Sequence, residues 1–168
     1  RGNNALVMPC YKDITADHWK VTRKSEELCC NFVRSACMIL DSVHGVGKIA
    51  HGDIKPDSFT LADYGNGKPD VYMLIDFGHA TKIDFAMESW MFIGTPGWMP
   101  ERSDPETVRD CDIYSLGTLV CWLVDYDSSH QGYPGLSHNS IFAIAKSFAE
   151  RKSYAPWQQR LARFSMSL

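Results

Sequence analysis

The most constraining feature of the sequence is a predicted helix over residues 110–124 that has almost no polar face. A helix that is apolar all round has to be buried by other elements or by lipid. Its most apolar stretch, Leu116–Val124, is interrupted by Gly117 and Thr118 and is far shorter than the ~20 residues that a membrane span needs. We therefore expect this helix to form the centre of a globular domain.

The size and charge of the chain narrow the classes of protein to which it can belong. Its 168 residues are enough for one hydrophobic core and too few for two ordinary domains. Hydrophobic residues make up 45% and charged residues 22%, which is typical of a folded globular domain. The net charge of −3 gives no basic excess, so we expect neither a nucleic-acid partner nor a membrane partner.

The six cysteines predict an intracellular protein. None of them forms a C-x-x-C pair, and no pair of histidines has zinc-finger spacing. Cys29, Cys30 and Cys37 fall in a helical pattern, in which a free cysteine behaves as a small buried hydrophobe. Because the chain shows neither a disulfide scaffold nor a signal peptide, we expect a cytoplasmic or nuclear location.

A second long helix is predicted over residues 25–46. Apolar residues recur there at three- and four-residue steps and make one apolar face. Ser25 is a suitable N-cap, and Gly45 and Gly47 end the pattern.

Short strands are predicted on either side of this helix. One covers residues 5–9 and ends at a proline, and three more cover residues 48–50, 59–61 and 71–75. Because the turn residues of 65–69 separate the last two strands, we expect those two to form a hairpin.

The remaining sequence completes the predicted fold class. Residues 78–105 have no sustained period and predict a long loop, which in a compact domain is usually functional or mobile. Shorter helical patterns cover residues 141–151 and 157–164. Helices dominate, so we predict a mainly helical α+β fold in which short β-hairpins carry the polar loops.

The charged residues of interest lie on two loops at strand ends. The segment HGDIKPDS, residues 51–58, places Asp53 and Lys55 between two predicted strands. Asp76 follows the last of these strands and precedes Gly78, which frees the backbone to turn. Two carboxylates and one lysine suit phosphoryl transfer, since one carboxylate can accept the proton of a hydroxyl and the other can hold Mg²⁺.

Structural roles compete with these chemical ones. Asp53 and Asp57 could each be a turn or capping residue, as most loop aspartates are. We expect His51 to pack beneath the loop rather than to take part in a reaction. The tryptophans are expected in the core or lining a groove rather than in a nucleic-acid stacking platform, because basic residues are not interleaved with them.

The motifs and their order resemble those of the protein kinases. HGDIKPDS looks like the kinase catalytic loop, and DFG matches the metal-binding motif. GTPGWMPE looks like the end of the activation segment, and DIYSLG resembles the start of the central helix. The HGDIKPD form, with MPCY near the start, most resembles the Bub spindle-checkpoint kinases. The resemblance implies the fold of a kinase C-terminal lobe.

The resemblance also implies a role for individual residues. Asp53 would be the catalytic base and Lys55 its charge-stabilising neighbour, and a lysine there implies Ser/Thr specificity. Asp76 and Ser58 would bind Mg²⁺ and help to bind ATP. The resemblance also implies a hinge whose backbone groups bind adenine. Its adenine-binding residues would be Met8, Cys10 and Tyr11. Three further residues would support the site: Thr95 below the substrate hydroxyl, Glu101 at the end of the activation segment and Asp112 on the backbone of the catalytic loop.

Three departures from the family pattern affect these expectations. Ser58 stands where the family has an asparagine, and its hydroxyl is a weaker ligand, so we expect looser metal binding. Gly52 replaces the arginine that usually pairs with a phosphate on the activation loop, so we do not expect switching by that route. GTPGWMPE is one residue shorter than the usual form, which could alter the substrate shelf.

No Gly-rich loop or strand lysine of the kinase N-terminal lobe is found in the sequence. We therefore expect residues 1–168 to be a partial kinase domain that comprises the hinge and the C-terminal lobe. In its full-length context it would transfer the γ-phosphoryl of ATP to a protein substrate. The alternative is a pseudokinase or stand-alone lobe that acts as a binding module, with a regulatory protein on the surface that faces the N-terminal lobe.

Overall fold

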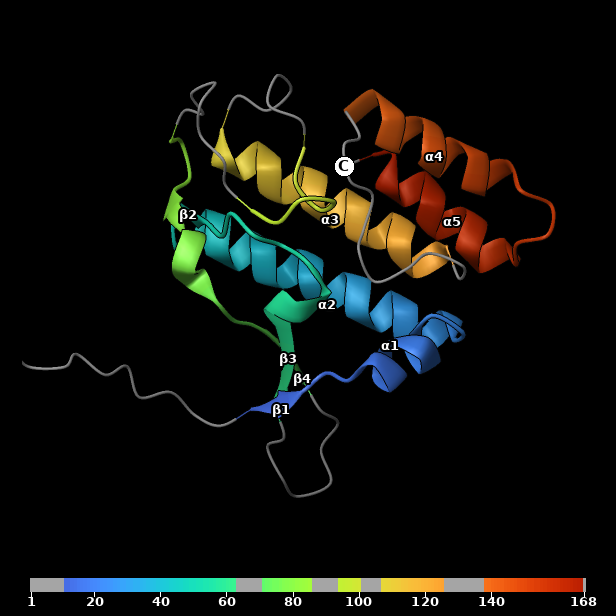
Figure 1. Ribbon diagram of the computed structural model, residues 1–168, viewed down its shortest axis with the longest axis horizontal. Helices are drawn as coiled ribbons and strands as arrows, with labels where there is room; N and C mark the ends of the chain where they lie inside the picture. Colours follow the sequence, from blue (N-terminus) through green and yellow to red (C-terminus); the bar gives the residue numbers. More distant parts are fainter. Residues whose placement is uncertain (1–10, 63–70, 86–93, 101–106, 126–137, 168) are drawn as a thin grey trace, which may run out of the picture.

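The computed structural model of the chain shows helices stacked beside two small sheets (Figure 1). The structure describes residues 11–62, 71–85, 94–100, 107–125 and 138–167. The strand predicted at residues 5–9 lies outside the described residues.

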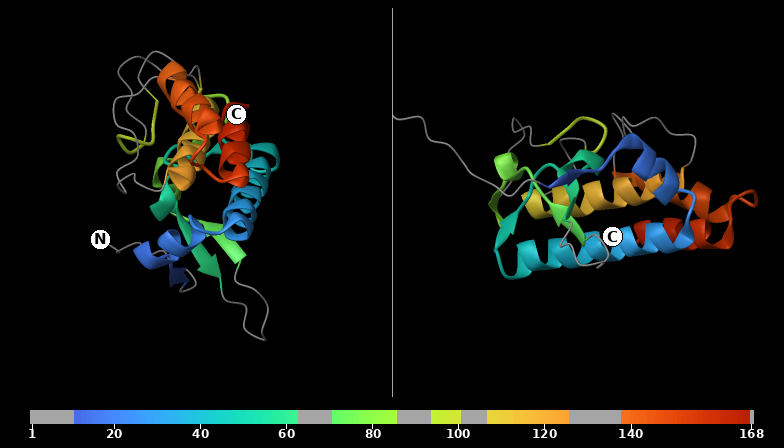
Figure 2. Two further views of the ribbon diagram at one scale, coloured as in Figure 1. Left: turned by 90° about the vertical axis from the view of Figure 1, so that its right-hand side faces the viewer. Right: turned by 90° about the horizontal axis from the view of Figure 1, so that it is seen from below.

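Five α-helices make up most of the described chain. They are α1 (Ala16–Thr22), α2 (Glu26–Gly45), α3 (Val108–Val124), α4 (His138–Glu150) and α5 (Pro156–Ser165). The helices α2 and α3 lie side by side, and α4 and α5 pack against each other and against α3 (Figure 2). The helix α3 is therefore covered by helices on more than one side.

The strands form two small antiparallel sheets. In the first, the order is β1 (Lys12–Asp13), β3 (Phe59–Ala62) and β4 (Val71–Leu74). The pairing of β3 with β4, with Phe59 opposite Leu74, confirms the predicted hairpin. The second sheet pairs β2 (Ile49–Ala50) with β5 (Thr81–Lys82). The mainly helical α+β fold is thus confirmed.

The helix α3 is central, as its apolar sequence predicts. Every residue of α3 is buried apart from Arg109, Asp110 and Ile113. Thr107 caps its first turn through a capping box, in which the side chains of Thr107 and Asp110 each accept a hydrogen bond from the other's backbone N–H. This cap starts the helix at Val108, two residues before the predicted start.

Aromatic rings join the helices to the sheet. The Trp122 ring is fully buried and makes edge contacts with Trp19 and Trp98, at centroid distances of 5.6 and 5.8 Å. Phe32 of α2 makes edge contacts with Trp19 and with Phe59 of β3. Such pairs add to the free energy gained by burial alone. The core therefore ties α1, α2, α3, β3 and residues 94–100 together.

Five short elements were not predicted, and they include the strand β1 and the 3₁₀ turn η1 (Pro56–Ser58). The helix α1 begins after Thr15, whose side chain accepts from the backbone N–H of His18. The strand β5 and the 3₁₀ turn η2 (Phe77–His79) lie in or beside the stretch predicted as a long loop. The two-residue strands β1 and β5 are held by pairing with β3 and β2, which leaves little local pattern.

The described cysteines differ in burial. Cys29, Cys111 and Cys121 are buried, whereas Cys30 and Cys37 are only half-buried, and all five thiols are free. Among the described residues, no helix has the length and apolar character that crossing a membrane requires.

The central position of Trp122 predicts a large loss of stability when its ring is removed. We expect Trp122→Ala to lower the free energy of unfolding by about 3–5 kcal/mol, because the ring leaves a cavity and loses two aromatic contacts. Val46→Ala is the matched control, since Val46 is 87% exposed. The free energy of unfolding of both variants is measured by urea unfolding, followed by far-ultraviolet circular dichroism. Equal unfolding midpoints for the two variants would contradict this packing.

Candidate active site

The segment of residues 51–58 connects β2 to β3 and carries the predicted base. Its His51 is fully buried. The His51 Nδ1 accepts from the backbone N–H of Asp53 at 3.2 Å, so its Nε2 is the protonated nitrogen and donates to the Ile75 carbonyl at 2.8 Å. His51 therefore joins the two loops at the ends of β2 and β4, and the expectation of a structural histidine is confirmed.

Asp112 of α3 holds the beginning of this segment. Its carboxylate accepts from the backbone N–H of His51 at 2.7 Å and from that of Gly52 at 2.8 Å. The same carboxylate is 2.8 Å from Nε2 of His44, at the end of α2. Gly52 has a φ of +83°, a left-handed conformation that favours glycine. The role that the resemblance implied for Asp112 is confirmed.

Asp53 sits between these anchors with one oxygen bound and one free. Its Oδ2 accepts from Nζ of Lys55 at 2.6 Å, and the same Nζ donates to Oγ1 of Thr95 at 2.7 Å. Its Oδ1 is buried and has no hydrogen-bond partner among the described residues. A buried carboxylate oxygen without a donor is costly, which is typical of a group kept ready for a ligand or a proton.

Opposing effects act on the pKa of Asp53. Burial, the largest of them, acts to raise the pKa of this carboxyl. The hydrogen bond and positive charge of Lys55, the nearby hydroxyl of Thr95 and a smaller contribution from His79 together outweigh it. The pKa of Asp53 therefore lies below its ordinary value, and the carboxylate is ionised at neutral pH.

Gly94 keeps the space beside the free oxygen of Asp53 open. Its φ is +109°, and a Cβ there would lie 2.9 Å from the Gly52 carbonyl oxygen and 3.7 Å from Oδ1 of Asp53. A side chain at this position would therefore strain the backbone and clash with the carbonyl oxygen of Gly52, which directly precedes Asp53. The sequence analysis placed this glycine in the GTPGWMPE motif but gave it no role.

Ser58 closes the segment against the second loop. Its side chain is buried, and its hydroxyl donates to the Asp53 carbonyl at 2.6 Å. The Ser58 carbonyl accepts from the backbone N–H of Ile75 at 2.9 Å. Ser58 thereby fixes Asp53 in place and brings the loop that carries Asp76 alongside.

Asp76 has a left-handed backbone conformation, which is uncommon for a residue with a side chain. It is exposed, and its φ of 63° and ψ of 61° put a non-glycine residue in the left-handed region. Such strain is often stored at functional sites. Its carboxylate makes no hydrogen bond to the described residues, and a Cβ on Gly78 would lie only 3.2 Å from Oδ1 of Asp76. The glycine of the DFG motif therefore leaves the carboxylate room for a ligand.

These oxygens fit a magnesium ion chemically. Mg²⁺ prefers oxygen ligands and usually combines one or two protein carboxylates with water and substrate phosphates. The exposed carboxylate of Asp76 meets this need, whereas the buried hydroxyl of Ser58 is already engaged as a donor. No group of three or more His, Cys, Asp and Glu side chains converges in the described part of the chain.

Some of the remaining predicted site residues lie outside the described part of the chain. Met8, Cys10 and Glu101 lie outside the described residues. Tyr11 is described and half-buried, just before β1. The sequence analysis missed His44, although an ionisable side chain on the apolar face of the helix over residues 25–46 was a detectable signal.

The contacts of Asp112 predict what its charge contributes. We expect Asp112→Asn to lower the free energy of unfolding by about 1–3 kcal/mol, because an amide nitrogen would face a backbone donor and leave it unsatisfied. Hydrogen exchange should accelerate at the amides of His51 and Gly52 in particular. Asp57→Asn is the matched control, since Asp57 is exposed, and unchanged exchange at His51 and Gly52 in Asp112→Asn would refute the anchor.

Comparison with known proteins gives the family. A search of curated proteins found no match. The family model of the protein kinase domain matches residues 3–162, which include the segment of Asp53, the loop of Asp76 and α3. The match covers nearly the whole of the 168 residues, so the chain belongs to the protein kinase family.

Proposed function

We propose that this chain carries the catalytic loop of a Ser/Thr protein kinase that transfers the γ-phosphoryl of ATP to a protein hydroxyl. The observation that carries the proposal is the free, buried Oδ1 of Asp53 beside the Lys55–Thr95 contact. In this proposal residues 1–168 supply the hinge and the C-terminal lobe, and the groups that clamp the phosphates come from an N-terminal lobe. The finer resemblance to the Bub kinases remains a prediction.

Asp53 supplies the base. Its Oδ1 accepts the proton of the substrate hydroxyl as the hydroxyl oxygen bonds to the γ-phosphorus. The bond from that phosphorus to the bridging oxygen breaks, and ADP leaves with the bonding electrons. Lys55, held 2.6 Å from Oδ2 of Asp53, offsets negative charge on the group in transfer. Since Lys55 also donates to Thr95, it ties the base to the segment on which a substrate would rest.

Asp76 is the residue best suited to hold Mg²⁺. When bound, the ion would neutralise charge on the ATP phosphates. Ser58 is the second ligand that the resemblance implies, and its oxygen keeps lone pairs after donating its proton to the Asp53 carbonyl. Because that hydroxyl is buried and short, we expect Ser58 to contribute less to metal binding than Asp76.

The second candidate function is a binding module of the pseudokinase type. Ser58 in place of asparagine favours it, because the hydroxyl already serves the backbone of Asp53. Phe77, which follows Asp76, is 42% exposed and offers an apolar contact to a regulatory protein on the surface that faces an N-terminal lobe. The intact pair of Asp53 and Asp76 favours the enzyme, since a binding module has no chemical need for both.

Removing the charge of Asp53 tests the proposed base. In the full-length protein we expect Asp53→Asn to reduce phosphotransfer about 10²–10⁴-fold, the usual contribution of a general base. Transfer of labelled phosphate from ATP to a dephosphorylated protein substrate measures it. Asp57→Asn should keep normal activity, because Asp57 is exposed and outside the site. Normal phosphate transfer by Asp53→Asn would contradict the proposal. The absence of phosphate transfer by the unaltered protein would favour the binding module.

Removing the charge of Asp76 tests the metal site separately. Asparagine tolerates the left-handed backbone of this position, so Asp76→Asn should leave the fold intact. We expect it to abolish the part of the ATP-induced rise in Tm that depends on Mg²⁺, because bound ligand stabilises the folded state. Asp84→Asn, which changes an exposed carboxylate in the same segment, is the control. An unchanged Mg²⁺ dependence in Asp76→Asn would remove Asp76 from the site.

A further inference from the structure

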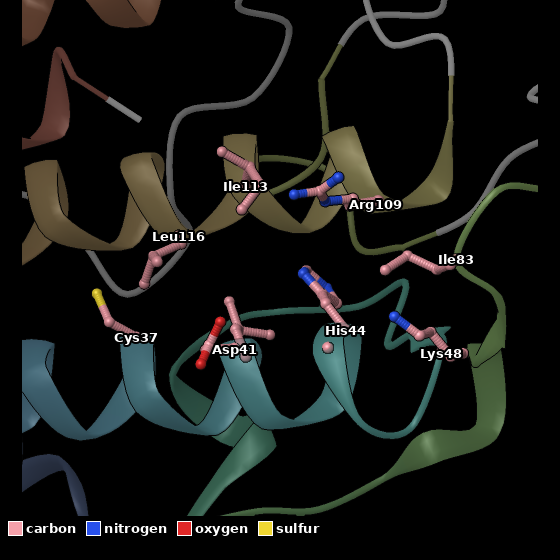
Figure 3. A pocket seen from close by; sticks show the side chains of 10 residues that line it. Cys37, Asp41, His44, Lys48, Ile83, Arg109, Ile113 and Leu116 are labelled. Carbon is pink, nitrogen blue, oxygen red and sulfur yellow. The ribbon is translucent and has the colours of Figure 1, made fainter.

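A cavity lies between α2 and α3, and its lining includes none of the residues assigned to the reaction (Figure 3). Its volume is about 350 Å³, within the range of small-molecule pockets. Two helices form its walls, and the turn after α2 and the residue after β5 close one end. Cys37 and Leu116 lie at one end of the cavity. Lys48 and Arg109 lie at the other end.

The two ends of the cavity differ in polarity. Figure 3 shows Cys37 and Leu116 together at one end, and Leu40 also lines the cavity. The other end is lined by Lys48, from the turn after α2, and by Arg109, from α3, with Ile83 between them (Figure 3). Neither cation has an ion pair among the described residues. Both cations therefore line the end of the cavity that lies away from Cys37 and Leu116.

The turn that carries Lys48 is tightly constrained. Lys48 has a φ of 52°, which is uncommon for a residue with a side chain. Its carbonyl accepts from the backbone N–H of Ile83 at 3.2 Å, and a Cβ on the preceding Gly47 would lie 2.7 Å from the Val43 carbonyl oxygen. Contacts on both sides therefore hold the backbone from which the Lys48 side chain reaches the cavity.

Two other ionisable groups line the cavity and limit what it can hold. His44 forms its inner wall, and its Nε2 is already bonded to Asp112. The carboxylate of Asp41 lies about midway along the cavity and disfavours a second negative charge there (Figure 3). A ligand with one acidic group at one end and an apolar body at the other avoids that repulsion.

We propose that this cavity binds a small monocarboxylate with an apolar body. Its carboxylate lies between Arg109 and Lys48, where the planar guanidinium can bind both oxygens. Its apolar body fills the end lined by Cys37 and Leu116 and removes their surface from water. The binding does not depend on the phosphotransfer proposed above, because none of these residues belongs to that site.

Protection of Cys37 from alkylation tests the proposal locally. Octanoate is the probe, and octan-1-ol is its uncharged match. Burial raises the pKa of the Cys37 thiol, so iodoacetamide labelling is followed at alkaline pH and located by peptide mass. Octanoate at about ten times its Kd leaves about one cavity in ten empty, so labelling of Cys37 should slow about tenfold. Cys30, half-buried on the same helix but outside the cavity, should label at an unchanged rate.

A charge variant tests the cationic end. Arg109→Met keeps the aliphatic stem, and because Arg109 is exposed the variant should fold normally. We expect it to weaken octanoate binding at least about tenfold, the loss of one charge-assisted contact, in calorimetric titration. Arg34→Met, an exposed arginine elsewhere on α2, should bind octanoate normally. The proposal is overturned if Cys37 is not protected, if octan-1-ol protects it equally, or if Arg109→Met binds octanoate as the unaltered chain does.

Discussion

The carboxylate of Asp112 is the contact on which the geometry of the site depends. It is buried in the central helix, where an ionised group without partners would cost many kcal/mol. Three donors satisfy it: the backbone N–H groups of His51 and Gly52, and the ring of His44. Because the two amides directly precede Asp53, the same bonds that satisfy this buried carboxylate also set the position of the proposed base.

The parts of the fold with strong local signals were predictable. The helix α3 is apolar on all faces, and the helix α2 has a regular apolar face with Ser25 as its N-cap, so both follow from sequence alone. The hairpin of β3 and β4 follows from two apolar strands on either side of a turn cluster. The neighbourhood of Asp53 and Lys55 could be predicted because the two residues lie close together in the sequence, and their contact needs no distant segment.

The rest depends on contacts between distant segments, which leave weak traces in a sequence. The strand β5 has only two residues and exists because β2 lies beside it. The bond from Ser58 to the Asp53 carbonyl and the left-handed conformation of Asp76 are set by the folded loop, so the residue types alone could not show them. The cavity between α2 and α3 needs the helices to be placed first, so no pattern in either helix indicates it.

The long sequence separation between the proposed catalytic loop and its anchor, Asp112, has a consequence for how the protein is made. His51 and Gly52 precede Asp112 by 61 and 60 residues. A ribosome adds about 5–20 residues each second, so the loop waits about 3–12 s for the carboxylate that shapes it. During that interval the apolar face of α2 also lacks the helix that covers it, which makes the nascent chain a natural client for chaperones. A chain that stops before residue 112 would carry a complete catalytic motif with nothing to hold it in place.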